Sequence, residues 1–378
     1  MKLTGPFRAA LGLAEDAKQH ATPDSALLLA CYRVMAGACM LLGQRGQARK
    51  HLMCATKVAQ ASADRIANAQ VWCQLADLDL SEGYGDDAWA RLDAAASVAE
   101  ESGDLLLDLR VRNHRGRLCM AQSRMAEAEH WYRRALERAR ALGDRRWVGG
   151  LHGNLGALMH VTGALDTAKE HYALAVAIAA EVGDRQWEGN GRCNLGLLLQ
   201  EIGQFEAAKR ELEDALTIGR GIGHQRLEAT CLCNLAIVFE SLAMPEAARA
   251  HYHQAVEAAR ANADQMSEGE FLGYLGLLCA RVGRGEEAHR TLHRADELLQ
   301  HSNDPGRRGL LAAQRALAAA LLGNSTLANS AMSQAESLLG PLPFGSTSFA
   351  GRLMVEASQA VHGPAQTVPA LGSANRSS

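Results

Sequence analysis

Aromatic residues and prolines are scarce in this sequence. Phe, Trp and Tyr make up 4% of the 378 residues, and only 8 residues are proline. A core of bulky rings is therefore excluded, and little interrupts helices, because proline is the worst helix former. The chain is instead 48% apolar and contains 69 alanines. Since alanine is the best helix former, the composition predicts an all-α protein packed on small side chains, neither disordered nor a β-sandwich.

The sequence also lacks an excess of charge and any long apolar run. Lys and Arg total 39 and Asp and Glu 42, a balance that argues against a nucleic-acid partner, which needs a strongly basic face. No stretch reaches the roughly 18 apolar residues of a membrane span, and Arg8 and Glu15 break the apolar start that a signal peptide needs. The nine cysteines do not resemble a secreted disulfide framework. We therefore expect no membrane partner and a cytoplasmic location, and the excess of Ala and Arg suggests a bacterial source.

Motifs for catalysis or cofactor binding are missing from the sequence. There is no Walker loop, no His-Glu-x-x-His and no Gly-x-Ser-x-Gly. His289 and His293 stand four residues apart and could touch one metal ion, but without an evident third ligand a surface pair is favoured. The sequence therefore predicts a protein that is not an enzyme and uses no cofactor and no metal.

An internal repeat dominates what is present. Asp recurs every forty residues, with His224 filling the one gap, at Asp24, Asp64, Asp104, Asp144, Asp184, Asp264 and Asp304. Cutting there gives eight units over 25–344, each with two halves that show the amphipathic helix period. A Gly-Asp pair can close one helix in the left-handed conformation and cap the next. A glycine also separates the halves of most units, and Ser123 and Ala243 replace it in two of them.

The units resemble tetratricopeptide repeats, which have Leu-Gly in the first helix, Gly at the turn and small, aromatic and small residues in the second. Unit 145–184 matches this pattern with Leu155, Gly156, Gly163, Ala168, Tyr172 and Ala175. At forty residues the units exceed the usual length of about 34, and the longer form resembles repeats in kinesin light chain, Leu-Gly-Asn polarity adaptors and maltose-regulator-like bacterial proteins. The resemblance implies a right-handed α-α solenoid, or superhelix, of about eight helix-turn-helix units plus flanking helices.

The ends of the chain depart from the repeat. Residues 1–24 are expected to form an N-terminal half-repeat or capping helix, with an apolar stripe through Leu11, Ala14 and Ala17. After the eight repeats of 25–344, residues 345–362 are expected to form a capping helix. Residues 363–378 are expected to be a disordered tail.

The resemblance also implies that the first helices line a concave groove. The Asn that directly precedes the Leu of the Leu-Gly pair would face this groove. Here these residues are Asn154, Asn194 and Asn234, and Asn190 shares the face by helical spacing. An amide both donates and accepts hydrogen bonds, so such a row can bind an extended peptide backbone. The alternative is that each Asn bonds only to a neighbouring helix.

Unit 105–144 adds a basic cluster to the same face. Helical spacing brings together Arg110, Asn113, His114 and Arg117. The cluster could receive an acidic side chain or a C-terminal carboxylate through charge-assisted hydrogen bonds. The alternative is an ordinary solvated helix face.

We therefore expect a non-catalytic interaction scaffold whose partner is a protein or peptide segment bound in the groove. The alternative is a sensor or oligomerisation module derived from a larger bacterial signalling ATPase or transcription regulator. Such a module would dock or self-associate through the N-terminal half-repeat.

Overall fold

The computed structural model describes residues 6–22, 25–41, 44–300, 302, 304–340 and 349–363, and within them it contains 18 helices and no strand. The first nine helices are α1 (Pro6–Gln19), α2 (Ala26–Leu41), α3 (Arg45–Ala61), α4 (Arg65–Glu82), α5 (Gly85–Ser102), α6 (Leu105–Ala121), α7 (Met125–Ala141), α8 (Arg145–Val161) and α9 (Leu165–Glu181). The others are α10 (Arg185–Glu201), α11 (Phe205–Gly221), α12 (Gln225–Ser241), α13 (Pro245–Ala261), α14 (Gln265–Arg281), α15 (Gly285–Leu299), α16 (Pro305–Leu321), α17 (Ser325–Leu339) and α18 (Phe349–His362). The predicted all-α solenoid of helix-turn-helix units is confirmed.

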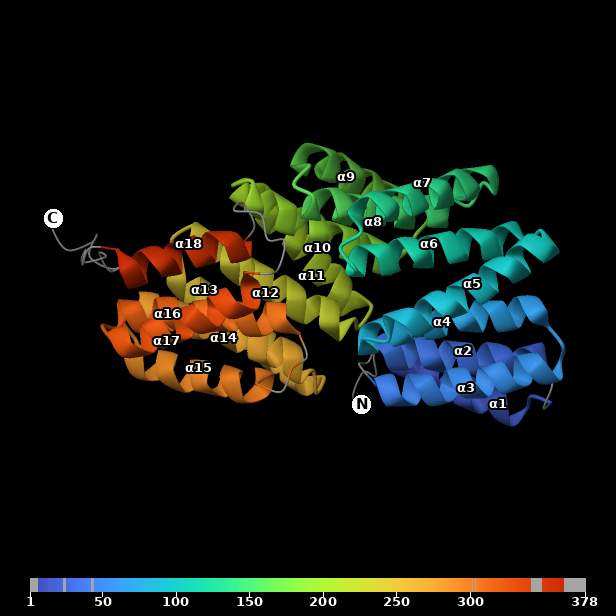
Figure 1. Cartoon of the computed structure of the whole chain (residues 1–378), viewed down its shortest axis with the longest axis horizontal. Helices are drawn as coiled ribbons and strands as arrows, with labels where there is room; N and C mark the ends of the chain where they lie inside the picture. The colour runs from blue at the N-terminus through green and yellow to red at the C-terminus, as the bar shows by residue number, and fades with distance from the viewer. Residues whose placement is uncertain are drawn as a thin grey trace. The chain divides into compact units, whose positions relative to one another are not determined.

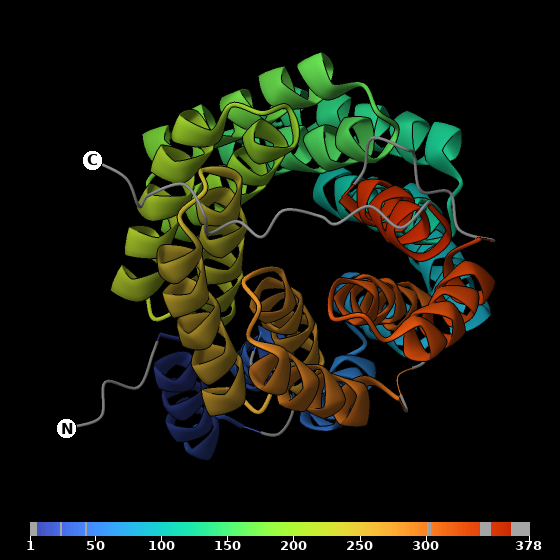
Figure 2. The same ribbon diagram turned by 90° about the vertical axis from the view of Figure 1, so that its left-hand side faces the viewer.

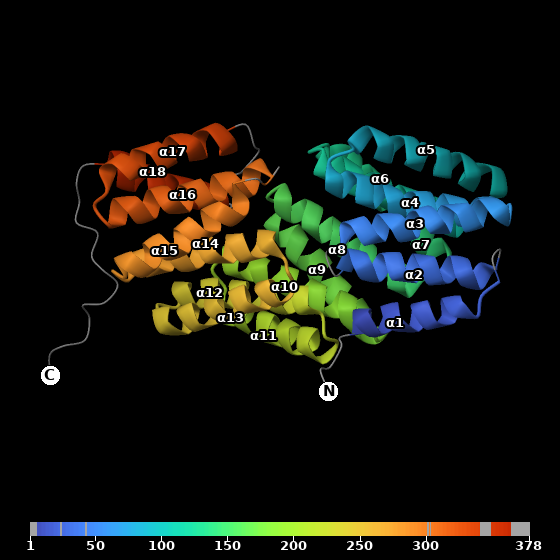
Figure 3. The same ribbon diagram turned by 90° about the horizontal axis from the view of Figure 1, so that it is seen from below.

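The chain divides into two compact units. Unit 1 comprises residues 1–195 and 217–224, and unit 2 comprises residues 196–216 and 225–378. In unit 1, α1 packs on α2, and the hairpins α2–α3, α4–α5, α6–α7 and α8–α9 follow in order (Figure 1 and Figure 3). In unit 2, the hairpins α12–α13, α14–α15 and α16–α17 follow in the same way, and α18 packs on α16 and α17.

The first helices of neighbouring hairpins contact one another directly. α4 packs on α6 in unit 1, and α14 packs on α16 in unit 2. Within each unit, Figure 2 shows consecutive hairpins lying side by side as the colour advances. Within each unit the first helices therefore share one layer, and side chains from several of them meet on one face.

The helix boundaries follow from local chemistry, as the repeat predicts. The side chains of Asp64, Asp104, Asp144, Asp184, Asp264 and Asp304 each accept a hydrogen bond from the backbone N–H three residues later. The turn residues Ser123 and Ala243, which stand in for glycine, adopt left-handed φ angles of 59° and 56°. Asp24 lies outside the described residues.

Close approach of the two helices in a hairpin depends on the glycine of the Leu-Gly pair. A methyl carbon added at Gly156 would lie 2.7 Å from Cδ1 of Tyr172, whose side chain is almost fully buried. The same carbon at Gly196 would lie 2.6 Å from Cγ of Leu212. The helices of these hairpins therefore pack too closely for a side chain at the glycine position.

The predicted end helices are present. Leu11, Ala14 and Ala17 of α1 pack with Cys31 and Met35 of α2, which confirms the apolar stripe. α18 falls within the span predicted for a closing helix. The expected domain boundaries stay predictions, and all but the first residue of the expected disordered tail lies outside the described residues.

Candidate functional site

Polar side chains from consecutive first helices meet on one side of unit 1. We call this surface the first-helix face. It comprises Arg33 of α2, Gln70, Gln74 and Asp77 of α4, Arg110, Asn113, His114 and Arg117 of α6, Trp147 and Asn154 of α8, and Asn190 and Asn194 of α10. Hydrogen bonds and ring contacts that cross from one helix to the next connect it from α2 to α8.

Two members of the predicted basic cluster are already paired within the protein. Nδ1 of His114 lies 2.8 Å from Oδ1 of Asp77, and Nη1 of Arg117 donates to Oδ2 at 2.6 Å. Burial by itself would raise the pKa of Asp77, but His114 and Arg117 hold it below its usual value. Asp77 therefore stays ionised, and its negative charge offsets part of the positive charge that the sequence predicted for the basic cluster.

Arg110 behaves differently from its neighbours on α6. Its guanidinium carbon lies 5.7 Å from the centre of the Trp147 ring, a cation–π distance. Its Nε is buried and has no hydrogen-bond partner among the residues that the structure describes. A buried N–H without a partner is costly, so this arginine has an unused donor.

Arg33 lies close to Arg110 and is held by neutral groups. It donates from Nη1 to Oε1 of Gln70 at 2.6 Å and from Nε to Oε1 of Gln74 at 3.2 Å. Burial lowers the pKa of Arg33, and the charge of Arg110 lowers it further. Among the described residues neither arginine contacts a carboxylate.

The asparagines of the predicted row differ in their surroundings. Asn113 is buried, and its Oδ1 accepts a hydrogen bond of 2.8 Å from Nδ2 of Asn154. Asn154 therefore makes the neighbour-helix bond that was the alternative to groove contact. Asn194 is exposed and Asn190 is partly exposed, whereas Asn234 lies in unit 2 and has a partner there. Groove contact by this row stays a prediction.

Arg33, Gln70 and Asp77 are among the members of the face that the sequence did not reveal. Arg33 holds the register position of Asn113, and Asp77 that of Arg117, each separated by a multiple of forty residues. That register would have placed them on the face. It could not show which of them pair.

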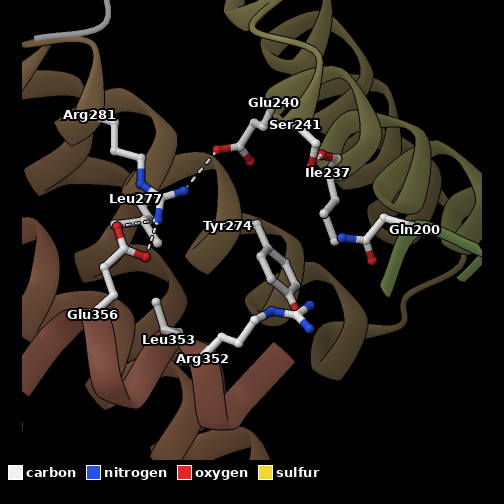
Figure 4. Close-up of a pocket in the computed structure, with 10 residues that line it drawn as sticks. All are labelled: Gln200, Ile237, Glu240, Ser241, Tyr274, Leu277, Arg281, Arg352, Leu353 and Glu356. Carbon is white, nitrogen blue, oxygen red and sulfur yellow. Dashed lines mark hydrogen bonds and ion pairs between the residues drawn. The ribbon is translucent and has the colours of Figure 1, made fainter. Parts of the chain in front are cut away.

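The corresponding side of unit 2 is covered by α18. A cavity of about 240 Å³ lies between α18 and helices α10, α12 and α14. At its edge Arg281 donates to Glu240 at 3.2 Å and to Glu356 of α18 at 2.7 Å (Figure 4). Leu353 of α18 and Leu277 of α14 both line this cavity and are both buried.

A buried network supports this arrangement. The Tyr252 hydroxyl donates to Oε1 of Glu240 at 2.5 Å, and its ring stacks on that of Tyr274 with centres 6.1 Å apart. Burial raises the pKa of Glu240, although Arg281 and Tyr252 act in the opposite direction. The polar groups at this position therefore hold helices together.

Other candidate chemistry is not assembled. The rings of His289 and His293 lie 6.4 Å apart on the surface, and no three or more His, Cys, Asp or Glu in the described ranges are grouped to hold a metal ion. The nine cysteines are free, and all except Cys54 are buried. None of the described helices is both long and apolar enough for a membrane span.

Stacked hairpins with close-packed glycines and capped boundaries define a helical-repeat protein of the solenoid class. Family models for the tetratricopeptide repeat match residues 109–142, 147–221 and 193–261. Residues 109–142 and 147–261 therefore consist of tetratricopeptide repeats. No curated protein matches its sequence closely enough to count as a relative.

Solved structures with the same fold are distant in sequence. A signal-transduction ATPase with numerous domains and a tetratricopeptide repeat sensor from Pyrococcus horikoshii is 14% identical with a TM-score of 0.60, over 89% of this chain and 53% of that one. Rap protein complexed with competence and sporulation factor is 14% identical with a TM-score of 0.60, over 88% and 90%. The apo quorum sensor NprR from B. thuringiensis is 14% identical with a TM-score of 0.56, over 91% and 99%. These likenesses show the fold, and the chain spans about half of the Pyrococcus protein.

Proposed function

We propose that this protein is a non-catalytic interaction module that binds a peptide or protein segment on the first-helix face of unit 1. The observation that carries the proposal is the continuous polar surface that α2, α4, α6 and α8 build from amide and guanidinium groups. Such groups suit an extended backbone, which offers both donors and acceptors. The equivalent side of unit 2 is occupied by α18, so unit 1 is the better candidate for a concave binding groove.

The similar solved structures support a peptide or protein ligand. The Rap protein is in complex with competence and sporulation factor, and the Rap conjugation gene regulator of plasmid pLS20 is in complex with the Phr* peptide. Within the groove we assign backbone contacts to Asn190 and Asn194, which are the exposed part of the amide row. Asn154 would contribute by changing partners from Asn113.

A second function is favoured by the similarity to the sensor-bearing ATPase from Pyrococcus horikoshii. Under this second function, the chain is a sensor or oligomerisation module that docks through α1. Leu13 of α1 has 70% of its surface exposed, which gives this helix an apolar outer contact. Light scattering separates the two functions, because self-association would appear as a mass above 40.4 kDa.

The primary proposal is tested by selecting binders from a random peptide library against the full chain. The affinity of the selected peptides is then measured for the double variant Asn190→Ala/Asn194→Ala. Loss of two hydrogen bonds predicts about tenfold weaker binding or more. The matched control is Gln47→Ala/Gln60→Ala, which removes two exposed amides from the second helix α3. Equal affinity of both double variants, or no selectable peptide, would contradict the proposal.

A further inference from the structure

We propose that Arg33 and Arg110 form a binding site for a side-chain carboxylate, from Asp or Glu, of the partner segment. We call Arg33, Gln70, Gln74, Arg110 and Trp147 the paired-arginine site. The inference rests on the proposed function, since it names the chemistry that the first-helix face of unit 1 recognises.

The first argument is the missing counter-charge. Several other arginines of unit 1 have carboxylate partners, as Arg117 has in Asp77 and Arg49 has in Asp79 at 2.7 Å. Arg33 bonds to Gln70 of α4, and α4 packs on α6, which carries Arg110. The charge of Arg110 accordingly lowers the pKa of Arg33, and the described residues place no carboxylate on either arginine. Two like charges near each other, partly withdrawn from water, destabilise the unbound protein. An anion bound between them removes that cost.

The second argument is that both guanidinium groups are held in place before any ligand binds. The two glutamine amides fix Arg33 through Nη1 and Nε, and the Trp147 ring supports Arg110. The buried Nε of Arg110 still has a donor to offer. A carboxylate fits the planar guanidinium through paired N–H···O bonds, which are short and charge-assisted. Preorganised donors of this kind lose little entropy on binding.

The third argument identifies the ligand as a side-chain carboxylate. On the same face, Oδ2 of Asp77 already accepts a hydrogen bond from Arg117, and Oδ1 lies 2.8 Å from Nδ1 of His114. A partner Asp or Glu at the paired-arginine site would reproduce this arrangement. The polar surface continues beyond the site to Asn190 and Asn194 of α10. A partner can therefore run through the site, so that an internal acidic side chain reaches the arginines.

The test uses the full chain and defined probes. Binding of an acetylated and amidated hexaglutamate peptide is measured by calorimetry and compared with an equally blocked hexaglutamine peptide. The variants Arg33→Gln and Arg110→Gln are compared with Arg133→Gln. This control removes the same charge from the second helix α7, outside the first-helix face, at an arginine paired with Glu129. We expect hexaglutamate alone to bind, with at least tenfold loss for the first two variants and less than threefold for the control.

A second readout does not depend on substitution. The Nε–H signals of Arg33 and Arg110 in ¹⁵N-labelled wild-type protein should shift on adding hexaglutamate, while that of Arg117 stays in place. Circular dichroism confirms that each variant folds. Equal binding of hexaglutamine, or equal losses for all three variants, would overturn the proposal. It would also be overturned if inorganic phosphate, or a blocked-side-chain peptide with a free C-terminus, shifted these signals and hexaglutamate did not.

The outcomes also separate this inference from the proposed function. Library peptides that need Asn190 and Asn194 but bind Arg110→Gln with full affinity would leave the proposed function standing and refute the paired-arginine site. Failure of the library selection would count against the proposed function. The hexaglutamate titration would still decide whether the arginines bind a carboxylate.

Discussion

Two glycines on α8 should respond in opposite ways to the same substitution. At Gly156 an added methyl carbon would lie 2.7 Å from Cδ1 and 2.9 Å from Cε1 of Tyr172. At Gly153, one turn earlier, the nearest atoms would be 3.8 Å away on Trp187 and 3.9 Å away on Ala175. The first contact is a steric overlap, whereas the second is ordinary van der Waals contact.

The magnitudes follow from these distances. Both alanine variants gain about 1 kcal/mol from replacing glycine inside a helix. Only Gly156→Ala has to displace the buried Tyr172 ring, which costs about 1–3 kcal/mol. We therefore expect Gly153→Ala to be more stable than wild type. The gain in helix propensity is the same in both variants and cancels when their free energies of unfolding are subtracted. The remaining difference measures the cost of the steric overlap with Tyr172 and should be about 1–3 kcal/mol in favour of Gly153→Ala.

Guanidinium unfolding followed by circular dichroism measures this difference. If the repeats unfold in steps, hydrogen exchange of the α8 and α9 amides gives the local free energy instead. Ala236 and Ala316 hold the register position of Gly156 in units that carry Tyr252 and Met332 in the register of Tyr172. Those hairpins accommodate a methyl group at this position, whereas in the α8–α9 hairpin the Tyr172 ring lies too close. Equal stability of the two variants would refute the argument that the Tyr172 ring closes this position.

Three further perturbations are predicted. Burial lowers the pKa of His152 to about 4, and His171, whose Nδ1 lies 2.9 Å from that of His152, lowers it further. Because the folded state binds this proton less readily than the unfolded state, the free energy of unfolding should fall as the pH drops from 6.5 towards 4. Thermal melts of His152→Leu should show a smaller fall. Ala243→Gly relieves a left-handed φ of 56° and should add about 0.5–1 kcal/mol to the free energy of unfolding. Gly163→Ala, at φ 81°, should lower that free energy. If both substitutions changed it in the same direction, backbone strain would not be the cause. Arg281→Gln removes the ion pair with Glu356 that joins α14 to α18 and should speed amide exchange in α18 about tenfold. Unchanged exchange would mean that apolar packing alone holds α18.

The fold was predictable because its determinants are local and repeat in register. Asp64 and Asp104 cap their helices through neighbouring backbone groups, so position in the sequence suffices to assign them. The same holds for Gly156, whose partner Tyr172 lies in the same hairpin. Such contacts recur every forty residues, and the pattern reveals them without knowledge of the tertiary structure.

The candidate site was predictable only in part, because pairing between helices depends on side-chain reach. Helical spacing placed Arg110 and Arg117 on one face. It could not show that Asp77 bonds Arg117, nor that no carboxylate in the described part of the chain contacts Arg110. Arg33 shares its register position with Cys73 and Asn113, so the repeat pattern does not mark that position as charged. Its proximity to Arg110 follows only from the packing of α2, α4 and α6.

Site-specific photo-crosslinking tests most directly whether the first-helix face of unit 1 binds the partner. A benzoylphenylalanine is placed at Asn194, exposed on the first helix α10, or at Leu174, which is 47% exposed on the second helix α9. Each protein is irradiated with the highest-affinity library peptide, and the adduct is quantified by mass spectrometry. The account predicts a peptide adduct from position 194 and none above background from position 174. Adducts of equal yield from both positions, or from position 174 alone, would contradict it.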